Sequence, residues 1–262
     1  MTPKASARPR QETPVGDVWS KVPEVTLVFW ILKILATTLG ETGGDALSMS
    51  MNLGYLVSTG IFGALFLAAV AVQIGAKKFH PIIYWVTIVA TTTVGTTLAD
   101  FADRSLGIGY AGGTTLLLAL LGASLFLWHR TLGTVSVETV SSPKAEAFYW
   151  ITIMFSQTLG TALGDWMADD AGFGYLGSAA VFGGALAILA GLYFTTRVSR
   201  TLLFWAAFIL TRPLGAVVGD FLDKPHVKGG LELSRYGATA LLIALMLVFI
   251  FAFSHRPARR GH

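Results

Sequence analysis

The sequence predicts an all-α membrane protein in which eight transmembrane helices form four parallel-repeat helical hairpins, with both termini in the cytoplasm. Three observations support this fold class: the apolar composition, the length of the apolar blocks and a fourfold internal repeat. Of the 262 residues, 53% are hydrophobic and 13% are charged, and the mean hydropathy is +0.64. Soluble domains carry roughly a quarter charged residues. The apolar blocks are about 20 residues long, the length that a helix needs to cross a bilayer, and strand-like alternation is absent.

The apolar blocks define the elements and the domain organisation in chain order. They place helices at 24–46, 54–76, 81–101, 109–129, 147–167, 174–195, 201–221 and 236–254. The first block is too long for a removable signal peptide and lacks its small-residue cleavage site. We therefore expect residues 1–23 to form a cytoplasmic tail, residues 24–254 a single membrane domain and residues 255–262 a basic cytoplasmic tail. The repeats then occupy 24–76, 81–129, 147–195 and 201–254.

The distribution of basic residues gives the orientation. Thirteen Lys and Arg residues fall on the side of the termini: Lys4, Arg8, Arg10, Lys21, Lys77, Lys78, Arg130, Lys144, Arg197, Arg200, Arg256, Arg259 and Arg260. Four fall on the other side: Arg104, Lys224, Lys228 and Arg235. Because cytoplasmic loops carry the excess of Lys and Arg, this asymmetry predicts that both termini are cytoplasmic.

The internal repeat has four copies. The first, third, fifth and seventh predicted helices begin with an aromatic residue and a Trp: Phe29-Trp30, Tyr84-Trp85, Tyr149-Trp150 and Phe204-Trp205. Ten residues after each Trp stands a Gly, and fifteen residues after it an Asp. The spacings between the Trp residues are 55, 65 and 55, which indicates a hairpin that was duplicated twice. Each copy contains two crossings, so the copies enter the membrane in the same sense, as parallel repeats around an axis along the membrane normal.

Polar residues at positions four apart share one face of each of these helices. The four stripes are Thr37, Glu41 and Asp45; Thr92, Thr96 and Asp100; Gln157, Thr161 and Asp165; Arg212, Ala216 and Asp220. A carboxylate that faced lipid would cost several kcal/mol, so we expect the stripes to face one another around a polar cavity ringed by four aspartates. The repeated Gly is expected at a close helix contact and the Trp residues in the interfacial belt.

Three residues break the fourfold pattern and suggest a binding site. Glu41, Lys33 and Arg212 stand where other repeats carry uncharged residues. The first stripe extends to Lys33, so that within the stripes five acids oppose two bases. A net-negative cavity concentrates cations. We expect cation binding by Glu41, Asp45, Asp100, Asp165, Asp220, Thr96, Thr161 and Gln157, with the five carboxylates as metal ligands and with Lys33 and Arg212 as counterions. Without cysteine, oxygen ligands favour Mg²⁺, Mn²⁺ or Ca²⁺.

An architectural interpretation remains open beside the functional one. Common ancestry alone would preserve an aspartate that holds each hairpin to the next, and Lys33 would then neutralise Glu41 structurally. The acids that follow the ring are expected to be external-loop charges: Asp103, Asp169, Asp170 and Asp223.

Several function classes are excluded. The glycines of 107–112 satisfy G-x-G-x-x-G, but this segment opens a membrane helix and follows no strand. The sequence contains no Walker motif, no G-x-S-x-G and no H-E-x-x-H. We therefore expect no enzyme, no ATP-driven pump and no nucleic-acid partner. No cofactor is expected, apart from a divalent cation as substrate.

Two resemblances involve the first repeat. The repeat opens with Lys21-Val22-Pro23-Glu24-Val25-Thr26 and Phe29-Trp30, and the repeated Gly and Asp follow within 36–45. This pattern resembles a family of bacterial multi-pass proteins known as uncharacterised "membrane-anchored proteins". This resemblance implies a place in the bacterial inner membrane. Glu41-Thr42-Gly43-Gly44-Asp45 is similar to the E-x-G-D signature of cation and manganese exchangers, although an extra Gly intervenes and the motif occurs in full once.

Together these features predict a secondary transporter, a proton-coupled exporter of a cation, with Mn²⁺ as the favoured substrate. Its partners would be the lipid bilayer, the cation and protons, and the oligomeric state is left open. The alternatives are an exporter of small organic cations, a non-transporting membrane scaffold or partner subunit, and a membrane enzyme using paired carboxylates, for which the sequence shows no positioned nucleophile or base.

Overall fold

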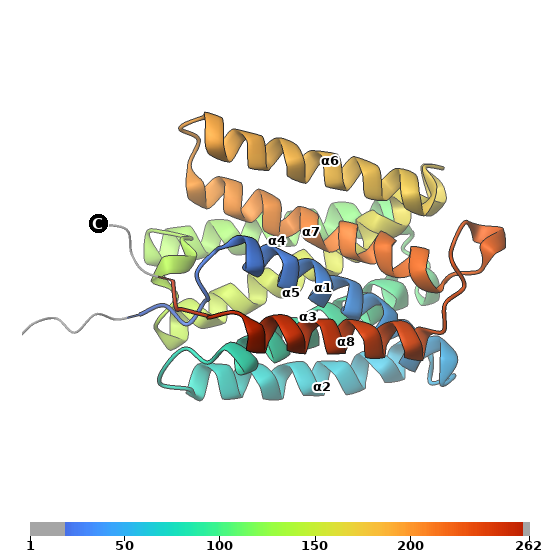
Figure 1. Ribbon diagram of the computed structural model, residues 1–262, viewed down its shortest axis with the longest axis horizontal. Coiled ribbons are helices and arrows are strands. Elements are labelled where there is room, and N and C mark those ends of the chain that lie inside the picture. The colour runs from blue at the N-terminus through green and yellow to red at the C-terminus, as the bar shows by residue number, and fades with distance from the viewer. Residues whose placement is uncertain (1–18, 259–262) are drawn as a thin grey trace, which may run out of the picture.

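The computed structural model describes residues 19–258, and within them the chain forms eight long α-helices. They are α1 Leu27–Asp45, α2 Gly54–Gly75, α3 Pro81–Asp100, α4 Tyr110–Leu132, α5 Pro143–Asp165, α6 Gly174–Thr195, α7 Arg200–Asp223 and α8 Arg235–Ala252 (Figure 1). The predicted helices are confirmed. The largest shift is at α5, which begins four residues early because Ser142 caps it and Pro143 occupies its first turn.

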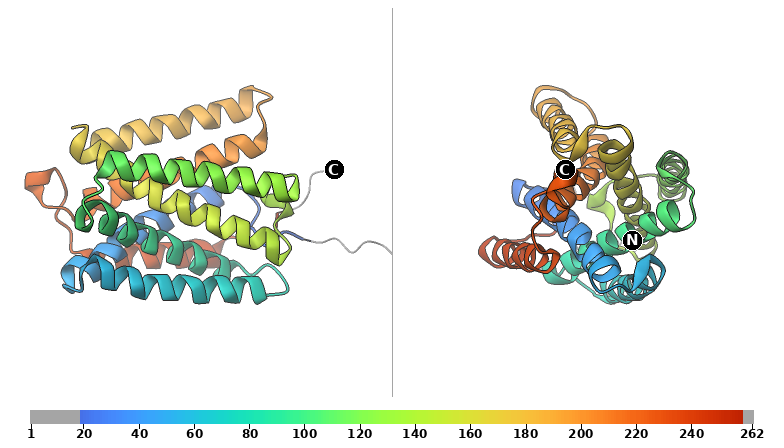
Figure 2. Two further views of the ribbon diagram at one scale, coloured as in Figure 1. Left: turned by 180° about the vertical axis from the view of Figure 1, so that it is seen from behind. Right: turned by 90° about the vertical axis from the view of Figure 1, so that its right-hand side faces the viewer.

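The eight helices form two layers around a common axis. The inner helices α1, α3, α5 and α7 each contact the next one, and α7 contacts α1, so the ring closes. The outer helices surround them, as the end view in Figure 2 shows. Each outer helix packs on the inner helix that follows it, α2 on α3, α4 on α5 and α6 on α7, while α8 packs on α1. The two helices of each predicted hairpin therefore pack mainly on the neighbouring repeats and little on each other.

Six helices are long and apolar enough to cross a membrane: α2, α4, α6, α7, α8 and α3 with the turn after it. The outer helices expose large apolar side chains such as Leu67, Phe126 and Phe194, as a lipid-facing layer requires. The other two, α1 and α5, carry more polar residues and lie in the inner ring. Their crossing of the membrane remains a prediction.

Three inner helices continue into a wider, π-helical turn. These turns, Ala46–Ser50 (η1), Phe101–Ser105 (η2) and Trp166–Asp170 (η4), each follow an aspartate of the predicted ring. Their i to i+5 hydrogen bonds are formed by the N–H groups of Met51, Leu106 and Ala171, at 2.9–3.0 Å. After Asp220, in contrast, α7 stays α-helical to Asp223.

The repeated glycines allow the inner helices to approach closely. A Cβ atom on Gly40 would lie 2.6 Å from Cβ of Thr92, and one on Gly215 would lie 2.5 Å from Cβ of Thr37. Gly95 and Gly160 lie in the same way against Gln157 and Arg212 of the following helix. Each glycine therefore contacts the next repeat around the ring, which confirms the close-packing interpretation and explains why a larger residue does not fit.

The first and last described residues, 19–24 and 256–258, lie at one end of the bundle, here named the terminal end; the opposite end is the distal end. The N–H of Glu24 donates to the carbonyl of Arg256, and the N–H of Ala258 to that of Val22, each at 2.8 Å. The two ends of the described chain thus lie together, whereas the cytoplasmic location of the termini remains a prediction. Of the charges that predict it, Lys4, Arg8, Arg10, Arg259 and Arg260 lie outside the described residues.

An aromatic layer fills the inner ring near the terminal end. Trp85, Trp150 and Trp205 are buried, and the hydroxyls of Tyr84 and Tyr149 lie 2.6 Å apart. The expectation that the repeated Trp residues form an interfacial belt is wrong for these three. They point into the inner ring, where they pack against other aromatic rings: Trp85 against Phe29, Trp150 against Tyr84 and Trp205 against Tyr149.

Candidate carboxylate site

The four repeated aspartates lie at the distal end of the inner helices and are buried. Asp45, Asp100, Asp165 and Asp220 are 1–3% exposed. Each occupies the same position on its helix, fifteen residues after the Trp of its repeat. Burial of four carboxylates in one layer requires positive charge or protons nearby, because an uncompensated buried charge costs several kcal/mol.

Two basic residues bridge the aspartates in pairs. The guanidinium of Arg104 contacts Asp100 at 2.9 Å and Asp165 at 3.1 Å. The ammonium of Lys224 contacts Asp45 at 2.5 Å and Asp220 at 3.0 Å. Each bridge joins one repeat to the next, so two basic residues pair with the four aspartates of the ring.

This role was not predicted, because Arg104 and Lys224 fall in the segments expected to connect helices on the external side. A signal was present: both residues stand nineteen positions after the Trp of their repeat, Trp85 and Trp205. The repeat pairs are related by an offset of 120 residues, and this offset also separates the two bridging cations.

The acids that follow the ring divide into two kinds. Asp103 and Asp223 are buried, at 9% and 6% exposed, so the expectation of external-loop charges is wrong for them. Asp223 accepts a hydrogen bond from Arg235 at 3.0 Å, which places its carboxylate among the charged residues of the distal end. Asp169 and Asp170 are exposed, as expected.

Arg212 occupies the centre of the ring, nearer the midpoint of the bundle. Its Nη2 donates to Oε2 of Glu41 at 2.8 Å, to Oγ1 of Thr96 at 2.7 Å and to Oγ1 of Thr161. One side chain of α7 thus contacts α1, α3 and α5. The open polar cavity that the sequence suggested is closed at this level by the guanidinium.

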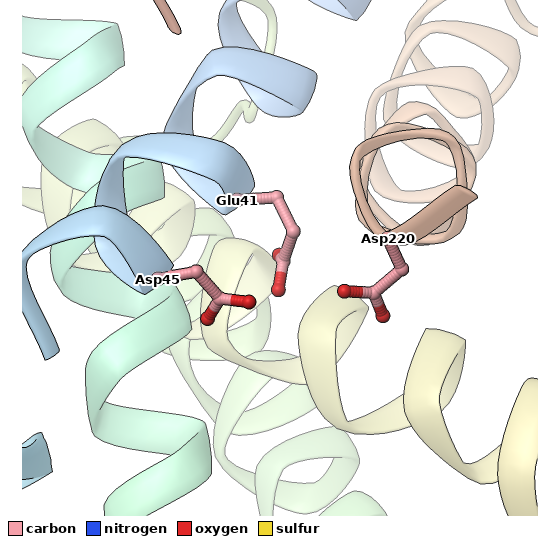
Figure 3. Close-up of side chains that lie close together, drawn as sticks. All are labelled: Glu41, Asp45 and Asp220. Atoms are coloured by element: carbon pink, nitrogen blue, oxygen red, sulfur yellow. The ribbon is translucent and has the colours of Figure 1, made fainter. Parts of the chain in front are cut away.

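Three carboxylates form a group that matches the chemistry of a cation site. Glu41, Asp45 and Asp220 each offer an oxygen, and these oxygens lie within 4.8 Å of one another. Figure 3 shows the two carboxylates of α1 and the carboxylate of α7 facing a common point. Such a set of hard oxygen ligands suits Mg²⁺, Mn²⁺ or Ca²⁺. The remaining predicted ligands, Asp100 and Asp165, lie outside this group and form ion pairs with Arg104.

Lys224 is the cation already held at this group. Burial opposes its charge, but the carboxylates of Asp220, Asp45 and Asp223 outweigh burial and hold the pKa of the ammonium well above its usual value. Lys224 follows the last residue of α7, at the start of the connection to α8. It is therefore a charged side chain in a connecting segment, next to oxygens that can bind a free cation.

Two predicted residues lie apart from the carboxylates. The Nζ of Lys33 lies 4.2 Å from the centre of the Phe208 ring and makes no ion pair within the described part of the chain. It therefore does not neutralise Glu41, as the architectural interpretation supposed. Gln157 lies one turn below Thr161 on α5, and its side-chain amide makes no hydrogen bond to any described residue.

Two surface grooves lie elsewhere. One, of about 490 Å³, is at the terminal end beside His129 and Trp205, and the other, of about 350 Å³, lies between α2 and α5 beside Phe66 and Trp150. Neither reaches the carboxylates, which are closed from solvent on both sides.

Comparison with known proteins finds a family but no individual relative. The family described as a repeat of unknown function (DUF347) matches four segments of the chain, residues 28–79, 83–134, 148–199 and 203–259. Comparison with curated proteins and with solved structures finds no match. Each matched segment begins within an inner helix and contains the outer helix that follows it, so the repeat seen in sequence and structure is the repeat of this family. The chain belongs to the DUF347 repeat family, of which it carries four consecutive copies.

Proposed function

We propose that this protein is a secondary transporter that exports a divalent cation such as Mn²⁺ across the bacterial inner membrane in exchange for protons. The observation that carries the proposal is the buried group of Glu41, Asp45 and Asp220, whose oxygens lie within 4.8 Å of one another, with the ammonium of Lys224 on Asp45 and Asp220. In this proposal all eight helices cross the membrane, including the polar inner helices α1 and α5.

Charge balance supports an exchange of cations at this group. Three carboxylates face Lys224 and Arg212, which leaves one unit of negative charge if all are ionised. A divalent ion that displaces Lys224 leaves the site at net charge zero or close to it, because the ammonium moves out as the metal enters. Protons on the same carboxylates also neutralise the site. Metal and protons therefore compete for the same oxygens, which is the requirement for exchange.

Closure on both sides fits an occluded state. Toward the distal end the carboxylates are covered by the bridges of Arg104 and Lys224, and toward the terminal end the aromatic layer of Tyr84 and Tyr149 fills the ring. A transporter opens one side at a time. In the proposed cycle, release of Lys224 from Asp45 and Asp220 opens the distal side.

Metal flux in proteoliposomes tests the proposal. A trapped dye that Mn²⁺ quenches reports uptake under an imposed pH gradient. Asp220→Asn removes a charged ligand and keeps the side-chain shape, so we expect Mn²⁺ affinity to fall at least ~10-fold. Lys224→Gln removes the competing cation, so we expect binding to strengthen by about tenfold, equivalent to about 1.4 kcal/mol. The matched control is Asp169→Asn, which removes an exposed acid of the same end and should transport normally.

A scaffold is the second candidate, and one observation favours it. Each aspartate of the ring already has a basic partner, as structural ion pairs do. A scaffold predicts no flux, and it predicts that both Asp220→Asn and Lys224→Gln lower stability without any response to Mn²⁺. Opposite shifts of metal affinity in the two variants would contradict the scaffold. Flux of tetramethylammonium in place of Mn²⁺ would instead identify an exporter of organic cations.

A further inference from the structure

The inner ring contains a second polar centre, separate from the carboxylates and nearer the terminal end. Lys33 and Arg212 are both completely buried, and so is Gln157. Lys33 precedes Glu41 by two helical turns, about 12 Å along α1. The three side chains come from α1, α7 and α5, which are neighbours in the ring.

These three side chains lie at neighbouring levels of the inner ring. The Nζ of Lys33 lies on the ring of Phe208, one turn before Arg212 on α7. Gln157 stands seven residues after the Trp of its repeat, as Arg212 does, and its Cβ lies against Gly95 of α3. Gly160 of α5 lies directly against the Arg212 side chain. Arg212 therefore contacts the helix that carries Gln157 and follows the turn that contacts Lys33.

Most of the polar atoms at this centre have no partner within residues 19–258. They are Nζ of Lys33, Nε and Nη1 of Arg212, and both Nε2 and Oε1 of Gln157. A buried donor without a partner costs about 1–3 kcal/mol, and a charged one costs more. All of these atoms except the Gln157 oxygen are donors, and of the two basic side chains only Arg212 faces a carboxylate.

From this donor-rich centre we infer a binding site for a small monovalent inorganic anion of the size of chloride, held by Lys33, Arg212 and Gln157. Unpartnered donors on two basic side chains and an amide select an anion, and the close packing of the ring limits its size. The inference is independent of the proposed cation transport, because the anion neutralises Lys33 and not the carboxylates. The site would balance the one buried base that lacks an ion pair in the described chain.

Bromide tests the site directly in the wild-type protein. Crystals of the full chain grown with bromide in place of chloride should show an anomalous peak in contact with Lys33 Nζ and Arg212. Water at this position gives no such peak, so its presence there instead of bromide would overturn the inference.

Thermal unfolding in detergent tests it in solution, with EDTA present so that the result does not depend on the metal site. At constant ionic strength, replacing gluconate by chloride should raise the Tm of the wild type by about 2–4 °C. Lys33→Met and Gln157→Leu should lose this shift. Lys78→Met, which removes an exposed charge, should keep it. A wild type that does not respond, or a Lys33→Met protein that responds equally, would contradict the site. If Lys33→Met does not fold, Gln157→Leu and the bromide map decide.

Discussion

Arg212 is the side chain on which the four inner helices converge. Its guanidinium and the Glu41 carboxylate are 0% and 4% exposed and lie 2.8 Å apart. The two threonines that share the same Nη2 belong to α3 and α5. A pair this deeply buried depends on both partners, because the removal of one leaves an uncompensated charge in a dry environment.

The Glu41–Arg212 pair should therefore show strong coupling. We expect Glu41→Gln and Arg212→Gln each to lower the free energy of unfolding by about 3–5 kcal/mol, and the double variant to lose less than the sum. Unfolding by denaturant in mixed micelles measures all three. Small losses for both single variants would indicate a hydrated cavity at this level. This expected loss is also the reason to test transport at Asp220 and Lys224, which lie nearer the distal surface.

The raised pKa of Lys224 sets the pH range in which its ion pairs stabilise the fold. In the folded chain the carboxylates raise this pKa above the unfolded value of roughly 10.4. The stabilisation is therefore complete below that value and is lost as the pH rises through the folded pKa. The stability difference between wild type and Lys224→Gln should stay constant from about pH 7 to 9 and shrink above about pH 10.4. A difference that shrinks already between pH 7 and 9 would show that Lys224 is not held by the carboxylates.

At the scale of elements, the glycines determine how the inner helices pack. Four glycines at equivalent positions each contact the following inner helix, and a second small residue follows four positions later in each repeat, as in Gly40 with Gly44 and Gly215 with Gly219. This small-xxx-small spacing lets helix backbones approach closely in a membrane. The apolar outer helices, in contrast, contain glycines with free space around them.

This difference predicts opposite outcomes for one substitution. Gly215→Ala places a methyl group 2.5 Å from Cβ and 2.9 Å from the backbone carbon of Thr37 on α1. We expect it to lower the free energy of unfolding by about 1–3 kcal/mol, as overpacking does. Gly184→Ala in α6 meets no atom within 4 Å and should be neutral or slightly stabilising. The Tm in detergent compares the two, and equal Tm values would show that α1 and α7 do not meet at Gly215.

At the scale of the whole molecule, closure of the ring determines at which end of the bundle the ends of the described chain and the connections between helices lie. Residues 22–24 pair with residues 256–258 at the terminal end, while Arg104, Lys224 and Arg235 gather at the distal end. The two ends therefore differ in charge pattern as well as in position. Lys78 and Lys228 are exposed at opposite ends of the bundle. A chemical label at each position would therefore show which side of the membrane that end occupies.

The absence of cysteine makes this orientation measurable. Lys78→Cys and Lys228→Cys each introduce the single thiol of the chain. By the positive-inside rule, a membrane-impermeant maleimide should label the Cys at 228 in intact cells, and the Cys at 78 after permeabilisation. The unsubstituted chain is the unlabelled control. Labelling of the Cys at 78 in intact cells would reverse the orientation.

The sequence by itself determined the features that depend on local periodicity. Apolar blocks of membrane length predicted the positions of all eight helices, and the Trp, Gly and Asp spacings predicted four repeats. The same spacing put Glu41 and Asp45 on one face of α1, because residues four apart share a face on any α-helix. These features need no knowledge of how the helices meet.

Only the tertiary structure decided the partners. The choice of Lys224 for Asp45, across 179 residues, and of Arg212 for Glu41, across 171, depends on contact between the first and last inner helices. The packing of each outer helix on the next repeat, and the burial of Trp85 and Trp150, also follow from ring closure. A period along one helix defines which residues share a face, but the side chain opposite that face belongs to another helix, and closure of the ring selects which helix it is.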